Sequence, residues 1–181
     1  MAAELVPGRP AVGDSHTFLL RVGAEQGLSA PVAVVNPAGL VGVVRSVASG
    51  KSFGEFWSHP DFRVSVRADS GPGAGIIRPV ASSSGETLML LEGVPFQMGL
   101  APGTRLVTAG VGGVYPSGIP VGTVLQEAES QSGWSRSYRV EPAARPAEVG
   151  FVLVWRRPSM EELVPALPPP VGDTIRVSGE S

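Results

Sequence analysis

The chain has 181 residues, of which 43% are hydrophobic and 17% charged, and it contains 24 glycines, 18 prolines and no cysteine. This apolar content is enough to build a core, so wholesale disorder is excluded, and the length allows one domain or two small ones. Fourteen basic and 16 acidic residues give a formal charge of −2, with Lys51 the only lysine, which argues against a nucleic-acid-binding surface. The lack of cysteine excludes disulfides, thiolate zinc sites and cysteine nucleophiles.

Neither a membrane span nor a secretory leader is predicted. No run approaches the roughly 20 apolar residues that a spanning helix needs. The first four residues, Met-Ala-Ala-Glu, offer neither a positively charged start nor an apolar stretch. These residues therefore predict a soluble globular unit.

Short apolar runs bounded by glycine and proline predict an all-β chain. In residues 62–67, Phe, Val and Val alternate with Arg, Ser and Arg, the period of a half-buried strand. Further strands are predicted at 17–22, 32–36, 41–47, 75–80, 87–91, 105–108, 121–126, 136–140 and 151–156. The best helical signal, residues 159–162, is a capping-box pattern that Pro165 ends after a single turn. The proline-rich stretch 157–181 predicts a flexible tail outside the core.

Two segments of the chain resemble each other. Residues 36–44 and 115–124 both contain Pro, a small residue, Gly and an aliphatic residue, followed by Val-Gly-x-Val. Their separation is far longer than a solenoid period, so the echo favours two similar small β domains, with chance similarity in a Gly- and Val-rich chain as the alternative. We expect the glycines and prolines of both segments to shape turns and close approaches of the backbone.

Several fragments imitate catalytic motifs without completing them. Residues 48–52 end like a phosphate-binding loop, but Arg45 stands where the motif needs glycine. Ser70 resembles a protease nucleophile for which His16 and His59 are the available bases, although a turn residue is the simpler interpretation. Two histidines cannot form a three-histidine zinc site, and the carboxylates show no ligand spacing. A glycosidase needs two facing carboxylates, for which Glu55, Asp61 and Asp69 are available without any pattern that favours them. No catalytic, cofactor-binding or metal-binding residue is predicted.

Residues 106–124, LVTAGVGGVYPSGIPVGTV, resemble the signature of the MreC family of rod shape-determining proteins. That family shows Thr-Ser-Gly followed by Gly-Gly-x-Phe-Pro-x-Gly-Ile-Pro-Val-Gly-x-Val; here Ala109 replaces the serine and Tyr115 the phenylalanine. Upstream, residues 35–43 match the family's Gly-Leu-Val-Gly element, and the resemblance extends over roughly residues 11–155. The structural motif residues that carry it are Gly39, Gly42, Gly110, Gly113, Pro116, Gly118, Pro120 and Gly122.

The resemblance implies two small six-stranded β-barrels, with the second inserted into the first. We expect residues 1–75 to form the first barrel, completed by a strand at 149–156, and residues 76–145 to form the second. Family members also carry a cytoplasmic stub, a membrane helix and a coiled coil before the barrels, none of which occurs in these 181 residues. We therefore expect the barrel region of a longer protein, with a divergent relative that lacks the anchor as the alternative.

The resemblance also implies a non-enzymatic scaffold in the periplasm, at the outer face of the cytoplasmic membrane. Its expected partner is a class B penicillin-binding protein, the transpeptidase that works with RodA, which the scaffold would bind and activate. Indirect links to MreB, MreD and RodA are implied, and self-association into a dimer or filament through barrel surfaces is the parallel expectation. No cofactor is implied.

Two other function classes remain open at this stage. A peptidoglycan- or carbohydrate-binding β module would show an aromatic platform on one barrel face. A small hydrolase would use Ser70 or the scattered carboxylates, and a hydrolase with Ser70 as its nucleophile would bring His16 or His59 to that residue. Candidate exposed anchors are Trp57, Trp134 and Tyr138, for which positions in the core are the favoured interpretation. Phe96, between Pro95 and Gln97, is ambiguous between the same two positions.

Overall fold

The computed structural model describes residues 1–7, 15–81, 87–129, 134–145 and 150–155. These residues form twelve strands and one short 3₁₀ turn, Ala24–Gln26. Within these ranges, no helix has the length and hydropathy needed to cross a bilayer. The predicted all-β class is confirmed. The predicted helical turn at 159–162 and the Pro-rich tail at 157–181 lie outside the described residues.

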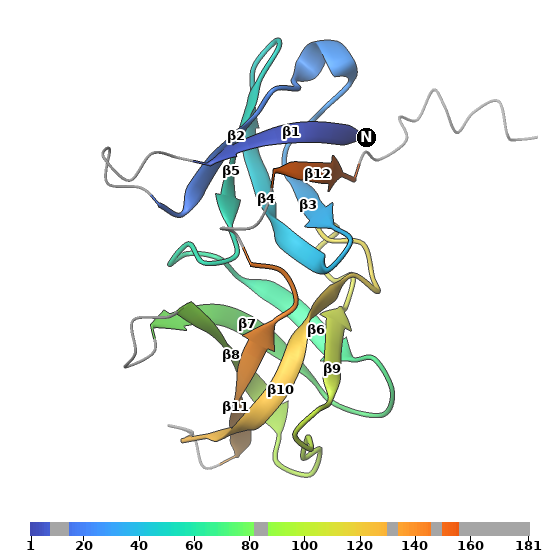
Figure 1. Ribbon diagram of the computed structural model, residues 1–181. Helices are drawn as coiled ribbons and strands as arrows, with labels where there is room; N and C mark the ends of the chain where they lie inside the picture. Colours follow the sequence, from blue (N-terminus) through green and yellow to red (C-terminus); the bar gives the residue numbers. More distant parts are fainter. Residues whose placement is uncertain (8–14, 82–86, 130–133, 146–149, 156–181) are drawn as a thin grey trace, which may run out of the picture.

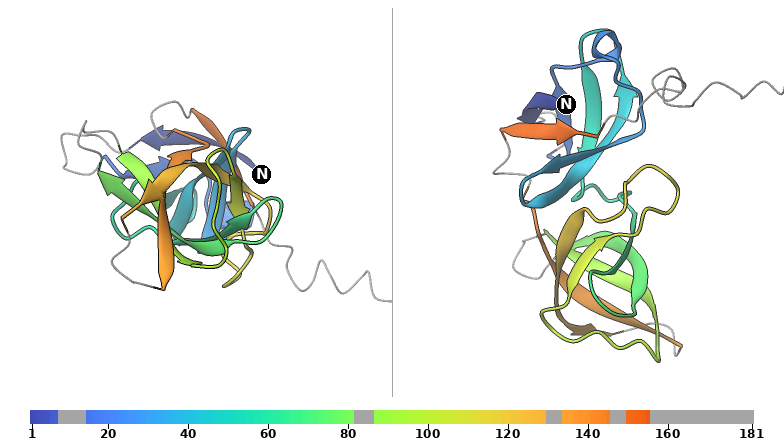
Figure 2. Two further views of the ribbon diagram at one scale, coloured as in Figure 1. Left: turned by 90° about the horizontal axis from the view of Figure 1, so that it is seen from below. Right: turned by 90° about the vertical axis from the view of Figure 1, so that its right-hand side faces the viewer.

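The strands close into two six-stranded barrels, stacked one on the other (Figures 1 and 2). The first barrel has the order β1-β12-β3-β4-β5-β2 and contains β1 (Ala2–Pro7), β2 (Thr17–Leu20), β3 (Val32–Asn36), β4 (Gly39–Val47), β5 (Ser52–Phe56) and β12 (Phe151–Val154). The second has the order β10-β11-β8-β7-β6-β9 and contains β6 (Val64–Ala68), β7 (Ala74–Ala81), β8 (Thr87–Pro95), β9 (Arg105–Thr108), β10 (Pro120–Ala128) and β11 (Ser135–Pro142).

The second barrel is inserted into the first, as predicted. The chain leaves the first barrel after β5, builds β6 to β11, and returns as β12, which pairs antiparallel with β1 and β3. The division between the barrels differs from the predicted one at residue 75. β6 pairs with β7 and β9, so Val64–Ala68 belongs to the second barrel. Alternating hydrophobicity identifies a strand but not its partner, which explains the misplaced boundary.

Two strands of the first barrel were not predicted, β1 and β5. In β5 the inward positions are Ser52, Gly54 and Phe56, whereas Phe53 points outward and is 45% exposed. A Cβ on Gly54 would collide with the ring of Phe18, so the aromatic ring of β2 fills the space that an apolar side chain of β5 would take. The pattern of β5 therefore lacks the usual apolar signal on its inner face.

β4 forms a wall between two hydrophobic cores. Its residues from Gly39 to Val44 are all buried. Val41 and Val44 belong to the core of the first barrel, whereas Leu40 and Val43 belong to a cluster with the side chains that fill the second barrel. A strand covered on both faces has a continuous apolar sequence. The near-unbroken run Leu-Val-Gly-Val-Val is thus explained by the junction of the barrels.

Candidate functional site

The two similar segments of the sequence meet at this junction. Gly39 has φ +152°, and a Cβ placed on it would collide with the carbonyl oxygen of Pro120 and lie 3.1 Å from the Cβ of Ala143. Only glycine adopts such a backbone conformation readily and leaves this much room. The β3–β4 turn of the first barrel therefore rests directly on the first residue of β10 in the second.

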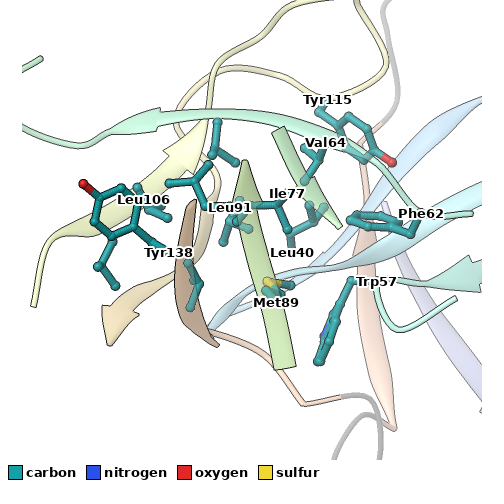
Figure 3. Close-up of a cluster of buried hydrophobic side chains, with 14 of the residues drawn as sticks. Leu40, Trp57, Phe62, Val64, Ile77, Met89, Leu91, Leu106, Tyr115 and Tyr138 are labelled. Atoms are coloured by element: carbon teal, nitrogen blue, oxygen red, sulfur yellow. The ribbon is translucent and has the colours of Figure 1, made fainter. Parts of the chain in front are cut away.

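Aromatic side chains seal the junction around Gly39. Trp57, which is 3% exposed, donates from Nε1 to the carbonyl oxygen of Ala144 over 2.7 Å. The rings of Phe62 and Tyr115 meet edge to face, with their centroids 6.0 Å apart. Figure 3 shows Leu40 and Trp57 lying in one cluster with Met89 of the second barrel. This buried cluster and the satisfied indole N–H hold the barrels as one body.

Thr108, a fully buried residue, fixes the signature loop 115–119. Its Oγ1 donates to the carbonyl oxygen of Pro116 and accepts from the backbone N–H of Ile119 over 2.9 Å. The backbone of Thr108 also accepts from the N–H of Gly118 over 3.0 Å. Sequence reasoning did not single out Thr108, although its position two residues before Gly110 in the signature was an available signal.

The remaining motif glycines lie in tight turns or against neighbouring backbone. A Cβ on Gly42 would collide with the carbonyl oxygen of Glu55, and one on Gly122 with that of Glu141. Backbone φ angles in the left-handed region occur at Gly110, Gly113 and Gly118. All eight motif residues belong to the junction, to the loop that packs on it, or to the strands that it joins.

Neither the phosphate-loop-like segment nor the protease-like Ser70 has the structural context that its motif requires. Residues 48–51 make the hairpin turn between β4 and β5, closed by the N–H of Ala48 donating to the carbonyl oxygen of Lys51, with a strand following instead of a helix. Ser70 lies in the turn after β6, whereas His16 Nδ1 lies 3.0 Å from Ser58 Oγ. The described ranges contain no group of three or more His, Asp or Glu side chains arranged to hold a metal ion.

The two histidines instead lie in a polar cluster beside the junction. Their ring centroids are 6.5 Å apart, and His59 Nδ1 accepts from the N–H of Asp61 over 3.2 Å. Glu55 Oε2 lies 3.9 Å from His59 and accepts from Arg45 Nε over 2.8 Å. Ser58, the two histidines, Glu55 and Arg45 thus form one network of polar contacts beside the junction.

The far end of the second barrel carries an exposed aromatic patch, which we define as Phe96, Met98, Trp134 and Arg136. Trp134 is 81% and Phe96 55% exposed, whereas Trp57 and Tyr138 are buried in the core. Predicting core positions was therefore right for Trp57 and Tyr138 and wrong for Trp134. Trp134 follows the run Glu-Ser-Gln-Ser-Gly, and this absence of apolar neighbours was the signal for exposure.

Within the aromatic patch, hydrogen bonds fix the backbone at Phe96 and Trp134, and Arg136 holds the ring of Phe96. Phe96 N–H donates to the carbonyl oxygen of Trp134 over 3.3 Å, which places the two residues opposite each other at the ends of β8 and β11. The guanidinium of Arg136 lies 4.3 Å from the centroid of the Phe96 ring, and its Nε donates to the Phe96 carbonyl oxygen. Nη1 of Arg136 also pairs with Glu127 over 3.1 Å. Exposed aromatic rings fixed by an arginine are typical of binding surfaces.

Comparison with known proteins gives one family. Residues 6–156 match the family described as "Rod shape-determining protein MreC, barrel core". A cell shape-determining protein MreC of Listeria monocytogenes is 30% identical over 138 residues, covering 75% of this chain and 46% of the relative. The Caulobacter vibrioides protein of the same name is 31% identical over 155 residues, covering 85% of this chain and 42% of the relative. The chain thus spans less than half the length of these curated relatives.

Solved structures with the same fold carry names of the same kind. The Listeria MreC structure superposes with a TM-score of 0.77 at 26% identity, covering 86% of this chain and 75% of the other. A periplasmic domain "from the cell shape-determining filament MreC" gives 0.70 at 18% identity, with 85% and 93% covered. MreC in a complex with the penicillin-binding protein PBP2 from Helicobacter pylori gives 0.67 at 15% identity, with 87% and 99% covered.

Substitution of Gly39 by alanine is expected to destabilise the protein by about 2–4 kcal/mol, because the new Cβ meets the Pro120 carbonyl at a backbone angle that alanine resists. Urea unfolding of both proteins measures the difference. Gly50→Ala is the matched control, since the nearest atom to a Cβ on Gly50 is a Glu25 carboxylate oxygen 4.0 Å away, and it should change stability by less than about 0.5 kcal/mol. Equal stability of the two variants would contradict the proposed contact.

Alkaline pH is expected to weaken the fold through Tyr115. Burial raises the pKa of Tyr115 to about 12, with Arg45 opposing and Glu55 assisting the shift. Between about pH 10 and 12 the phenol ionises in the unfolded chain but stays protonated in the folded one, so stability falls across that window, by up to about 3 kcal/mol. Unfolding of Tyr115→Phe at pH 8 and pH 11.5 should show a smaller loss than the parent chain.

Proposed function

This chain belongs to the MreC family of rod shape-determining proteins, and from that premise we propose that it is a non-enzymatic scaffold of the cell-wall elongation machinery. The match over residues 6–156 carries the proposal. It is supported by the relative from Helicobacter pylori that was solved in complex with PBP2, a penicillin-binding protein. The proposed partner is a class B penicillin-binding protein, which the scaffold binds and activates in the periplasm, at the outer face of the cytoplasmic membrane.

The aromatic patch is the proposed contact for this transpeptidase. Tryptophan, other aromatic residues and arginine contribute most to binding where they are fixed before the partner arrives, because little side-chain freedom is then lost. Arg136 is bound to both Glu127 and Phe96, so the Phe96 ring and the cation are already placed. Met98, 41% exposed, adds a side chain that adapts to an apolar partner.

Activation is proposed to work by a shift between two conformations of the transpeptidase. A scaffold that binds the active form more tightly than the resting form raises the population of the active form. Such a shift from about 1% to 99% requires a roughly 10⁴-fold difference in affinity. The two barrels share the buried cluster around Trp57 and Leu40, so the scaffold does not bend when the partner binds. The free energy of the contact can therefore contribute to the difference in affinity between the two forms of the transpeptidase.

Further parts of the scaffold function rest on the family alone. We propose that the chain links through the longer protein to MreD, RodA and MreB, and that it self-associates. Self-association is supported by one solved relative, which is described as a domain of a filament.

Glycan binding is the second candidate function, and the aromatic patch is the observation that favours it. Two exposed rings at one end of a barrel, Phe96 and Trp134, provide faces on which sugar rings can stack. Such a module would bind peptidoglycan without any transpeptidase.

Replacing Trp134 or Phe96 by serine is expected to weaken binding of the elongation transpeptidase at least about 10-fold, because each removes a hot-spot ring. Interferometry with the extracytoplasmic part of the same organism's enzyme measures this, with the division transpeptidase as the specificity control. Phe53→Ser, an exposed ring on the first barrel, should leave the affinity unchanged.

The two candidate functions give different results in the same experiment. In one outcome, the chain binds purified peptidoglycan, Trp134→Ser abolishes this binding, and neither transpeptidase binds saturably. This outcome would reject the scaffold function in favour of the glycan-binding module. In another outcome, the transpeptidase binds saturably and with the same affinity to Trp134→Ser, Phe96→Ser and Phe53→Ser. This outcome would support the transpeptidase as the partner but reject the aromatic patch as its contact.

A further inference from the structure

The outer face of β12 has a sequence suited to burial, but it is exposed among the residues that the structure describes. In Phe-Val-Leu-Val-Trp, residues 151–155, Val152 and Val154 point into the first barrel, at 3% and 1% exposure. Phe151, Leu153 and Trp155 point outward and are 76%, 49% and 52% exposed. A strand with water on one face normally alternates apolar and polar residues, and a wholly apolar strand is normally covered on both faces.

On the neighbouring strand β3, the corresponding outer face is covered by the second barrel. Val35 of β3 lies opposite Leu153, and the backbone N–H of Trp155 donates to the carbonyl oxygen of Ala33. Both β3 residues also point out of the first barrel, but they pack in the cluster shared with the second barrel. The apolar outer face thus continues from the junction onto β12, where no part of the described chain lies on it.

On the other side, β1 gives this face a neutral rim. Ala2 lies opposite Leu153, and Glu4 opposite Phe151. The carboxylate of Glu4 pairs with Arg21 over 3.4 Å, so the two charges beside the strip compensate each other. The whole chain carries a formal charge of only −2. Neither the rim nor the net charge therefore opposes the approach of an identical face.

We propose that the outer face of β12, formed by Phe151, Leu153 and Trp155, is a self-association surface on which a second copy of this chain packs its own β12. The three side chains expose about 350 Å² together, taking roughly 200 Å² for each ring or aliphatic chain when fully exposed. Two such faces, together with the β1 residues beside them, would bury about 1,000 Å² in total, which is only the lower limit for a specific interface. The dimer is therefore weak and reversible, and a two-fold axis sets Leu153 against or near its own copy.

The proposal rests on the self-association included in the proposed function, and its test is separate from transpeptidase binding. Sedimentation of the whole 181-residue chain between about 1 and 500 µM should show a reversible monomer–dimer equilibrium, as expected for an interface of this size. Leu153→Glu and Trp155→Ser should each weaken it at least 10-fold. Trp134→Ser, in the aromatic patch, should leave it unchanged. Since the changed side chains point away from the core, circular dichroism should show both variants folded.

A second measurement tests the symmetry without relying on loss of binding. The chain has no cysteine, so Leu153→Cys introduces a single thiol. In the proposed dimer this variant should form a disulfide-linked dimer much faster than Ile76→Cys, an exposed position of the second barrel. Equal rates would overturn the proposal.

Four other results would also overturn the proposal. The chain could stay monomeric at all concentrations, or its dimer could be insensitive to Leu153→Glu. Association that appears only after removal of residues 157–181 would identify the tail as the occupant of this face. If Leu153→Glu abolishes transpeptidase binding while the parent chain stays monomeric, the enzyme covers β12. If Leu153→Glu loses the dimer but keeps full affinity for the transpeptidase, both the self-association surface and the proposed function are supported.

Discussion

The structure depends on one constraint, that a single strand must serve two cores. In most barrels the outer side of a strand faces water, but the outer side of β4 at Leu40 and Val43 faces the interior of the second barrel. The backbones then approach so closely that Gly39 has no room for a Cβ beside Pro120. Separating the barrels would expose Leu40, Val43 and the indole of Trp57 together, so their relative orientation is set by hydrophobic burial and not by a linker. A surface on one barrel consequently keeps a fixed position relative to a surface on the other.

Much of this fold could be predicted from local sequence because short apolar runs and glycine-rich turns mark strands individually. The strand at 32–36 has the predicted bounds, and the echo between residues 36–44 and 115–124 indicated two similar small β domains. Partner choice was not predictable in the same way. β6 has a clear alternating pattern that suits either barrel, and only its pairing with β9, about 40 residues later in the chain, decides between them.

The candidate site was partly predictable for the same reason. The motif glycines stand out because few other residues tolerate their backbone angles, and the signature loop could be located from them. The contact between Gly39 and Pro120 involves positions 81 apart in the sequence, and no local pattern indicates it. The aromatic patch depends likewise on β8 and β11 ending side by side, which brings Arg136 over Phe96. Trp57 is buried by a cluster that forms only in the folded chain, whereas the polar run before Trp134 already indicated the exposure of that residue.

The insertion of one barrel into the other has a consequence for synthesis on the ribosome. The second barrel is built from a continuous stretch, β6 to β11, and all of its strands are available once β11 has emerged. The first barrel cannot close until β12 arrives about 95 residues after β5, and until then β1 and β3 present unpaired edges. The order of folding therefore differs from the order of translation. The inserted second barrel can fold first, and the N-terminal barrel closes last, against the second barrel. A chain released before residue 151 would keep an open sheet edge, a natural target for chaperones and proteases.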